Sequence, residues 1–222
     1  TKKITTEDRR IDVNSAYSFN RIGANDNIEE GASLTYGFDY VKTNNIKRDI
    51  LKFSLANILR FDETKNLPNE NGMGNTVSDL IGNISYNPKE ILKINYDFSL
   101  DSNLKDTNYQ FIDTEFKINN FVTSFEFLNE NKSKSSTNYI TNKTSYYLDE
   151  SKKLAFETRE NKTTGLTEFY NLIYQYRNDC LTAAIEYNKD FYDDGELQPE
   201  ENVFFKLTII PFGEASTVNL LQ

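Results

Sequence analysis

Carboxylates and a single cysteine are the side chains whose types suggest chemistry in this chain. Acidic residues gather at Asp193, Asp194, Glu196, Glu200 and Glu201, and carboxylate oxygens of this kind bind divalent cations. Their spacing differs from that of an EF-hand loop, so a solvated acidic loop is the simpler interpretation. Elsewhere the carboxylates form no pair with a distinctive spacing. The sequence therefore predicts neither a catalytic carboxylate nor a metal site.

The absence of histidine removes several classes of function. No residue of the chain is histidine, which excludes Ser-His-Asp and Cys-His catalysis and histidine-containing metal sites. The tripeptide Gly72-Met73-Gly74 lacks the Lys-Ser/Thr pair and the strand and helix around a phosphate-binding loop. The net charge is -9 and the pI about 4.7, whereas nucleic-acid binding needs a basic patch. We expect a protein that is not an enzyme, has no cofactor and binds no nucleic acid.

Cys180 has two interpretations. It is the one cysteine of the 222 residues, so a disulfide within the chain is excluded. Free cysteines are commonly small buried apolar residues. Cys180 also follows Arg177-Asn178-Asp179, a turn-like sequence that places it at a strand end. If that end lies in an oxidising compartment, the thiol can pair with a cysteine elsewhere.

The elements that position these residues are strands. Between residues 91 and 100, Leu92, Ile94, Tyr96, Phe98 and Leu100 alternate with polar residues. Successive side chains of a strand point to opposite faces, so this pattern predicts one apolar and one polar face. The same alternation recurs along the chain and predicts about twelve strands. They are 10–19, 31–41, 48–59, 75–86, 90–100, 107–118, 120–129, 138–149, 152–161, 165–177, 180–190 and 202–211.

The connections between these strands alternate in length. Barrels of the bacterial outer membrane have short periplasmic turns and longer external loops. A soluble meander has no reason to keep such an alternation, so we favour a transmembrane β-barrel with a periplasmic C-terminus. The longer, external connections would be 20–30, 61–74, 101–106, 130–137, 162–164 and 191–201, and the periplasmic turns 42–47, 87–89, 119, 150–151 and 178–179.

The composition agrees with a barrel but also with a polar soluble β-protein. No run approaches the roughly 20 apolar residues of a membrane helix. Because only alternate residues of a barrel strand face lipid, half of its side chains can be polar. The chain has 14 Tyr and 16 Phe but no Trp. Such rings form interfacial girdles in outer-membrane barrels, although aromatic residues also favour strands in general.

Four segments resemble a known family. They are Tyr17–Gly23, Glu30–Tyr40, Asn178–Tyr192 and Phe204–Gly213. Together they are similar to the C-terminal half of the lipopolysaccharide (LPS)-assembly protein LptD family, in its alphaproteobacterial form. Single barrel strands look alike, but the order and spacing of these segments fit the family.

This resemblance implies a fold, a location and partners. LptD proteins are large outer-membrane barrels with a periplasmic N-terminal domain. They receive LPS from periplasmic bridge proteins, hold a plug lipoprotein called LptE, and release LPS to the outer leaflet through a lateral seam between the first and last strands. The family barrel has roughly twice as many strands as this chain. We therefore expect residues 1–222 to be one incomplete domain, an open half-barrel forming the C-terminal part of the barrel, in contact with membrane lipid.

The resemblance also implies site residues. Cys180 matches the C-terminal cysteine that pairs with the N-terminal domain, although the family often has two neighbouring cysteines there and this chain has one. The segment Val203–Pro211 matches the last strand, one side of the seam. Proline has no backbone N–H to donate to a neighbouring strand. This property agrees with a weakly paired seam, but it agrees equally with the ordinary end of a strand. The seam residues are Val203, Phe205, Leu207, Ile209 and Pro211.

Two alternatives stay open. A general porin-type barrel would be closed by these strands alone, with strand 10–19 paired to strand 202–211. A soluble, β-rich surface-binding protein would turn its apolar side chains inward to a core.

Overall fold

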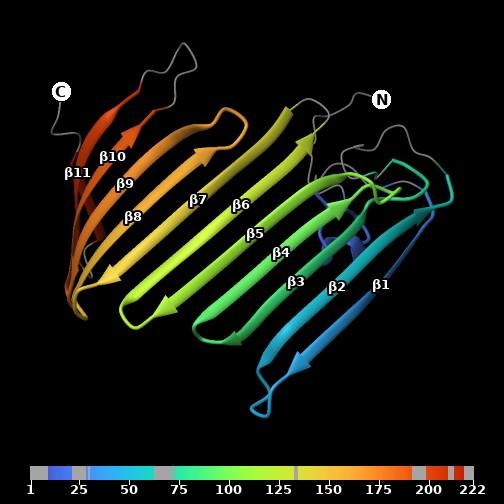
Figure 1. The fold of residues 1–222 in the computed structure, drawn as a ribbon, viewed down its shortest axis with the longest axis horizontal. Coiled ribbons are helices and arrows are strands. Elements are labelled where there is room, and N and C mark those ends of the chain that lie inside the picture. The colour runs from blue at the N-terminus through green and yellow to red at the C-terminus, as the bar shows by residue number, and fades with distance from the viewer. Residues whose placement is uncertain are drawn as a thin grey trace. The chain divides into compact units, whose positions relative to one another are not determined.

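The computed structural model describes residues 10–21, 29, 31–62, 72, 74–132, 135–191, 199–209 and 213–217. These residues form one short 3₁₀ helix, η1 (Ser15–Tyr17), and a 12-stranded sheet in which each strand neighbours the next in chain order (Figure 1). The strands are β1 (Ser33–Thr43), β2 (Asp49–Arg60), β3 (Leu80–Lys89), β4 (Leu92–Leu100), β5 (Thr107–Ile118), β6 (Phe121–Lys132), β7 (Ser135–Tyr147), β8 (Lys152–Asn161), β9 (Leu166–Arg177), β10 (Leu181–Asp190), β11 (Glu201–Ile209) and β12 (Gly213–Thr217).

The predicted fold class is confirmed. The described chain is an antiparallel meander in a single sheet, and the strand order runs from β1 at one edge to β12 at the other, so the sheet is open. The turns match their sequences: Asn119, in the connection between β5 and β6, has φ 48°. Asparagine tolerates this left-handed conformation better than most residues.

The first predicted strand is wrong. Residues 10–19 form the segment around η1 instead of a strand. Within it, the backbone N–H of Ser15 donates to Asp12 Oδ1 at 2.7 Å, and the N–H of Asp12 donates to Ser15 Oγ at 2.9 Å. These two reciprocal hydrogen bonds provide partners for backbone N–H groups within the segment. The segment therefore does not depend on pairing with a neighbouring strand for them. The strand pairing that would close a porin-type barrel through residues 10–19 is therefore not formed.

Further boundaries differ from the prediction. The third predicted strand, 75–86, corresponds to β3 at Leu80–Lys89, which includes the expected turn 87–89. The expected loop 130–137 is largely strand, because β6 continues to Lys132 and β7 begins at Ser135. The alternation of long and short connections is weaker at this point than the sequence suggested. A twelfth strand, β12, follows the predicted last strand and pairs with β11 from Phe205 to Ile209.

The chain divides into two compact units. Unit 1 comprises residues 1–89, 93–113 and 128–137, and unit 2 comprises residues 90–92, 114–127 and 138–222. In unit 1, β2 pairs with β1 and β3, for example Phe38 with Leu55 and Leu51 with Tyr86. In unit 2, continuous ladders join β7 to β12, for example Leu154 with Tyr174 and Ile185 with Phe205.

Unit 1 contains a small apolar core. It consists of Ile11 and Ala16, from the segment around η1, and Ala56, Ile58 and Ile81, from β2 and β3. Burying one Ile side chain contributes about 1.5–3 kcal/mol, so this core can hold the segment on the sheet but is modest for a domain of this length.

Candidate functional site

One face of unit 2 is apolar and exposed. Directly opposite residues of neighbouring strands share a face. One row of cross-strand neighbours runs from β8 through β9 and β10 to β11. It consists of Leu154, Tyr174, Ile185 and Phe205. Their exposed fractions are 38%, 37%, 51% and 38%. A row of large apolar side chains across four central strands is thus open to the surroundings, which a water-soluble sheet would bury.

One face of unit 1 is also apolar and exposed. Tyr36, Phe38 and Tyr40 share one face of β1 and are 54%, 57% and 46% exposed. Phe38 packs on Phe53 of β2 with ring centroids 6.4 Å apart. The expectation for a soluble protein, apolar side chains turned inward to a core, is therefore not met in either unit.

The opposite face of unit 2 is polar. Glu157, Asn171, Asn188 and Asn202 lie opposite one another on β8 to β11. Beside this row, Asn171 Nδ2 donates to Glu186 Oε1 at 2.8 Å, and Lys206 Nζ donates to Glu186 Oε2 at 2.6 Å.

The polar face of unit 2 continues across β6 and β7. Lys143 Nζ lies 3.4 Å from Glu126 Oε1 and 3.5 Å from Glu157 Oε1, so it is shared between carboxylates of the two neighbouring strands. Cross-strand ion pairs and amides of this kind suit a surface in contact with water. Unit 2 therefore has one apolar, exposed face and one polar face whose side chains are joined by hydrogen bonds and ion pairs.

A segment of the chain covers part of the other face of unit 1, opposite Tyr36, Phe38 and Tyr40. We call residues 10–21 the strap. Thr35 Oγ1 of β1 donates to the backbone oxygen of Ala16 at 3.1 Å, and Ile11 and Ala16 pack on Ala56, Ile58 and Ile81. Arg10 lies with its Cζ 3.4 Å from the centre of the Tyr109 ring, a cation–π contact with β5.

A buried ion pair anchors the C-terminal end of the strap. Arg21 Nη1 lies 3.0 Å from Glu29 Oε1, and Arg60 of β2 also donates to Glu29. The three side chains are each less than a tenth exposed. Because the loss of one partner would leave a buried charge uncompensated, this group holds the strap end firmly.

Asp79 forms a second buried node in unit 1. Ala56 faces Ile81 whereas Leu59 bridges to Val77, so the chain before β3 carries one extra residue, a β-bulge. Asp79 Oδ2 accepts from Ser99 Oγ at 2.9 Å and from Asn108 Nδ2 at 2.8 Å. Burial raises the pKa of the Asp79 carboxyl, and the hydrogen bonds from Asn108 and Ser99 oppose that rise. This carboxylate links the start of β3 to β4 and β5.

Cys180 lies in the turn between β9 and β10 and is exposed. Its backbone N–H donates to Asn178 Oδ1 at 3.0 Å, so the side chain of Asn178 shapes the turn. The thiol is accessible to a partner, and burial as a small apolar residue is ruled out for it.

The predicted seam residues lie on the apolar face of β11. Val203, Phe205, Leu207 and Ile209 pair with β10, and β12 pairs with the opposite edge of Phe205–Ile209. One more strand thus stands between β11 and the edge of the sheet. Pro211 lies outside the described residues, as do Asp193, Asp194 and Glu196 of the acidic stretch.

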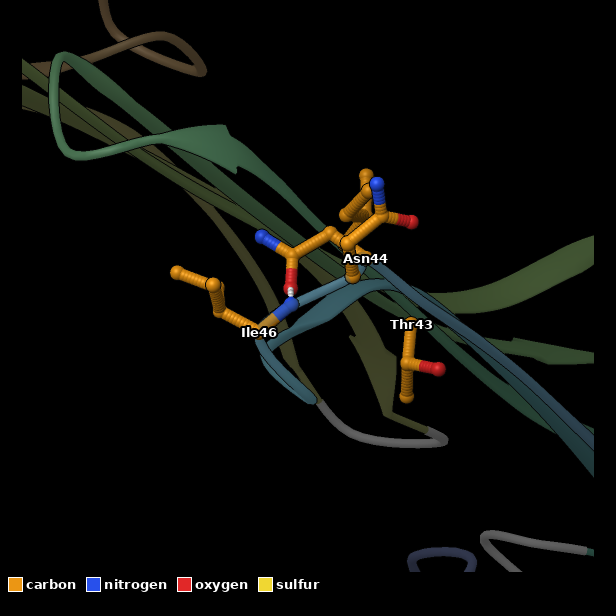
Figure 2. Close-up of a pocket in the computed structure, with 5 residues that line it drawn as sticks. Thr43, Asn44 and Ile46 are labelled. Carbon is orange, nitrogen blue, oxygen red and sulfur yellow. Dashed lines mark hydrogen bonds between the residues drawn. The ribbon is translucent and has the colours of Figure 1, made fainter.

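The described residues hold no cluster of metal-binding side chains. Among them, no group of three His, Cys, Asp or Glu side chains is placed to bind a metal ion. Figure 2 shows a hollow beside the β1–β2 turn, lined by Thr43, Asn44, Asn45, Ile46 and Ile50, where Asn44 Oδ1 accepts from the Ile46 N–H at 3.0 Å. The lining offers amides and apolar groups but no charged side chain, and we assign no ligand to it.

Comparison with known families decides the identity. The model of the family described as LPS transport system D, LptD, matches residues 4–178. The chain belongs to the LptD family. Membership of the LptD family implies a part in LPS transport and assembly at the outer membrane, a transport role and not catalysis. None of the curated proteins matches the chain.

The match to the LptD family ends before two of the predicted sites. Cys180 and β11 lie beyond residue 178, so their roles rest on the resemblance alone.

In the described residues, no helix has the length and apolar character needed to cross a membrane.

Sequence reasoning missed the strap and the Asp79 node. One signal for the strap was available: Gly37 interrupts β1, and glycine inside a strand often marks the close approach of another group. A Cβ at Gly37 would lie 2.1 Å from Tyr17 Oη. The pattern Asp12-x-x-Ser15 was a second signal, because this spacing suits a locally closed turn. The Asp79 node depends on a bulge and had no comparable signal.

Proposed function

We propose that this chain is part of an outer-membrane translocon that delivers LPS to the outer leaflet. The polar face lines the route of the saccharide, and a lateral seam releases the acyl chains. The supporting observation is the distribution of side chains over the two faces of unit 2. Large apolar side chains are exposed on one face, and hydrogen-bonded polar side chains lie on the other. Membrane lipid, periplasmic bridge proteins and an LptE-like plug are the proposed partners.

Neighbouring residues of β10 offer a direct test. Glu186 lies on the polar face and Ile185 on the apolar face. We would place a photo-reactive phenylalanine analogue at either position in the complete protein. The protein would be reconstituted into phospholipid vesicles free of LPS, and LPS supplied through the bridge proteins. An LPS adduct is expected at position 186 first, and at position 185 only after LPS has entered the membrane.

The same vesicles separate this function from a general porin. A porin would let small sugars cross the membrane without LPS adducts at position 186. An adduct at position 185 that forms as early as that at 186, or that forms without the bridge proteins, would contradict a route along the polar face.

We further propose that Cys180 forms a disulfide with the N-terminal domain of the complete protein. The exposure of its side chain in a turn supports this role. Cys180→Ser should remove one interdomain disulfide and change the mobility of the oxidised protein on a non-reducing gel. Unchanged mobility would show that Cys180 stays a free thiol.

The seam proposal concerns Val203, Phe205, Leu207, Ile209 and Pro211. Phe205 and Ile209 are partly exposed on the apolar face. Photo-reactive groups at these two positions should give LPS adducts earlier in transport than the same group at Leu172, which lies on the same face of β9. Simultaneous adducts at all three positions would place the exit elsewhere.

A further inference from the structure

Polar side chains on β7 interrupt the apolar face of unit 2. Asn142 and Thr144 lie opposite Thr158 and Phe156 of β8. Phe156 is part of the exposed apolar face. Because directly paired residues share a face, Asn142, Thr144 and Thr158 lie on that face too. We call these three residues, together with Thr123 of β6, which is hydrogen-bonded to two of them, the polar patch.

Hydrogen bonds within the polar patch join β6 to β7. Asn142 Nδ2 donates to Thr123 Oγ1 and to the backbone oxygen of Ser124, both at 3.1 Å. Thr144 Oγ1 donates to Asn142 Oδ1 at 3.1 Å and lies 2.8 Å from Thr123 Oγ1. The side-chain donors of Asn142 and Thr144 are thus used within the protein. What the patch still offers to its surroundings is the second acceptor position of each oxygen.

The polar patch lies within the part of β7 that a membrane would surround. A transmembrane β-strand takes about 9–11 residues, whereas β7 has 13. Whichever stretch of about nine residues crosses the bilayer, residues 139–143 are among them. Asn142 is therefore inside the span at every depth that the strand can take.

The row of apolar side chains on this face is shorter on β8 than on β10. Every second residue of Leu181–Tyr187 on β10 is apolar. On β8 the corresponding row is Leu154 and Phe156, and the charged residues Lys152 and Glu160 enclose it on the same face. Residues 153–159 lie between these two charges, fewer than the roughly 9–11 residues that cross a bilayer of ordinary thickness.

We propose that the bilayer is thinned beside β7 and β8, so that phospholipid headgroups reach the polar patch. A bilayer thins at modest cost around an apolar surface that is shorter than its hydrocarbon core. Ammonium headgroups and the water around them are donors, which suits a patch that offers acceptors. The inference rests on the proposed function, because it requires the apolar face of unit 2 to meet a membrane.

Paired substitutions at positions 142 and 172 compare the surroundings of the two strands. Asn142→Leu and Asn142→Lys lose the same side-chain hydrogen bonds, so the difference between them reports what surrounds position 142. Leu172→Lys against the unchanged protein gives the matched difference on the apolar face of β9. The complete protein would be unfolded with urea in phospholipid vesicles free of LPS.

We expect Asn142→Lys to unfold at a urea midpoint equal to or above that of Asn142→Leu, because a headgroup layer accommodates the charge. Leu172→Lys should unfold at a lower midpoint than the unchanged protein, because hydrocarbon does not. A lysine penalty at position 142 as large as that at position 172 would show that hydrocarbon covers the patch, and the inference would be wrong.

A photo-reactive phenylalanine analogue at position 140 identifies the neighbouring lipid group while the patch stays intact. Ile140 lies next to Asn142 on the same face of β7 and opposite Glu160. The complete protein would be placed in vesicles rich in phosphatidylethanolamine, and mass spectrometry would assign each adduct to the headgroup or to an acyl chain. We expect the headgroup fraction at position 140 to be at least threefold that at position 172.

The outcomes separate this inference from the proposed function. Equal headgroup fractions at the two positions, with acyl-chain adducts at 172, would overturn the thinning and leave the membrane-facing surface in place. Adducts between position 140 and a protein would show that a partner covers the patch, which also contradicts the inference. The absence of lipid adducts at position 172 would count against the membrane-facing surface itself, and the proposed function would fall with it.

Discussion

Asp79 shows how a single polar residue organises one end of unit 1. Its carboxylate accepts hydrogen bonds from Ser99, which is 0% exposed, and from Asn108 on the next strand. Its backbone oxygen accepts from Asn57 Nδ2 at 3.1 Å and Ser78 Oγ at 2.9 Å. A buried charge is costly, but here the donors of three strands depend on its oxygens.

Substitution at Asp79 should separate charge from hydrogen bonding. Both side-chain bonds reach the same oxygen, so Asp79→Asn keeps an acceptor for each and should change the free energy of unfolding by less than about 1 kcal/mol. Asp79→Leu leaves two donors unsatisfied and should cost roughly 2–5 kcal/mol. Urea unfolding in lipid vesicles measures both. Equal losses for the two variants would contradict the hydrogen-bonding role.

The raised pKa of Asp79 predicts a pH dependence. The folded state binds a proton more tightly than the unfolded state, so this group's contribution to stability falls as pH rises from its ordinary pKa of 3.8 through the raised folded value. At neutral pH the native protein should therefore be less stable relative to Asp79→Asn than it is near pH 4. Unfolding midpoints of both proteins at the two pH values test this, and a constant difference would argue against a raised pKa.

At the scale of elements, connecting loops contain local strain. Leu104 has φ 58° in the connection between β4 and β5, and its N–H donates to Asp101 O at 2.8 Å. The left-handed conformation costs about 1–2 kcal/mol for a residue with a Cβ, less for asparagine. The strand pairing on either side imposes this conformation on Leu104.

Relieving that strain should stabilise the protein. Leu104 is 61% exposed, so its replacement removes little packing. Leu104→Asn should raise the free energy of unfolding by about 0.5–1 kcal/mol. Lys105→Asn, at the next residue, is the control and should change it by less than about 0.5 kcal/mol. If Lys105→Asn raised the free energy of unfolding as much as Leu104→Asn does, relief of backbone strain at Leu104 would not be the cause.

At the scale of the whole molecule, the distribution of apolar side chains is the reverse of that in a soluble β-protein. In unit 1 the buried core is a small cluster beneath the strap, whereas in each unit rows of aromatic or aliphatic side chains lie exposed on one face. In the proposed function, bilayer hydrocarbon covers the exposed apolar side chains, as a second layer of protein does in a soluble sheet.

Adjacent residues of β9 can test this distribution. Leu172 is 48% exposed on the apolar face, and Asn171 lies on the polar face. In a bilayer Leu172→Lys should cost about 2–4 kcal/mol, while Asn171→Lys should cost less than about 1 kcal/mol. Unfolding in lipid vesicles measures both variants. In water an exposed leucine could be replaced by lysine almost freely, so two equally small effects would contradict a membrane-facing surface.

The alternation of apolar and polar residues was enough to predict the all-β meander, the strands β1, β2 and β4 to β11, and their two unlike faces. This information is local, since side-chain direction in a strand follows from sequence spacing alone. The resemblance of four segments added the family, which the match over residues 4–178 confirms.

Other features required contacts between residues distant in sequence. Residues 10–19 alternate well enough to predict a strand, yet they lie in the strap, where the bonds between Asp12 and Ser15 and the packing of Ile11 and Ala16 on Ala56, Ile58 and Ile81 replace strand pairing. The node at Asp79 likewise joins residues of β4 and β5 across a bulge. Periodicity assigns a side chain to a face, but which part of the chain covers that face depends on long-range packing, and no local pattern encodes it.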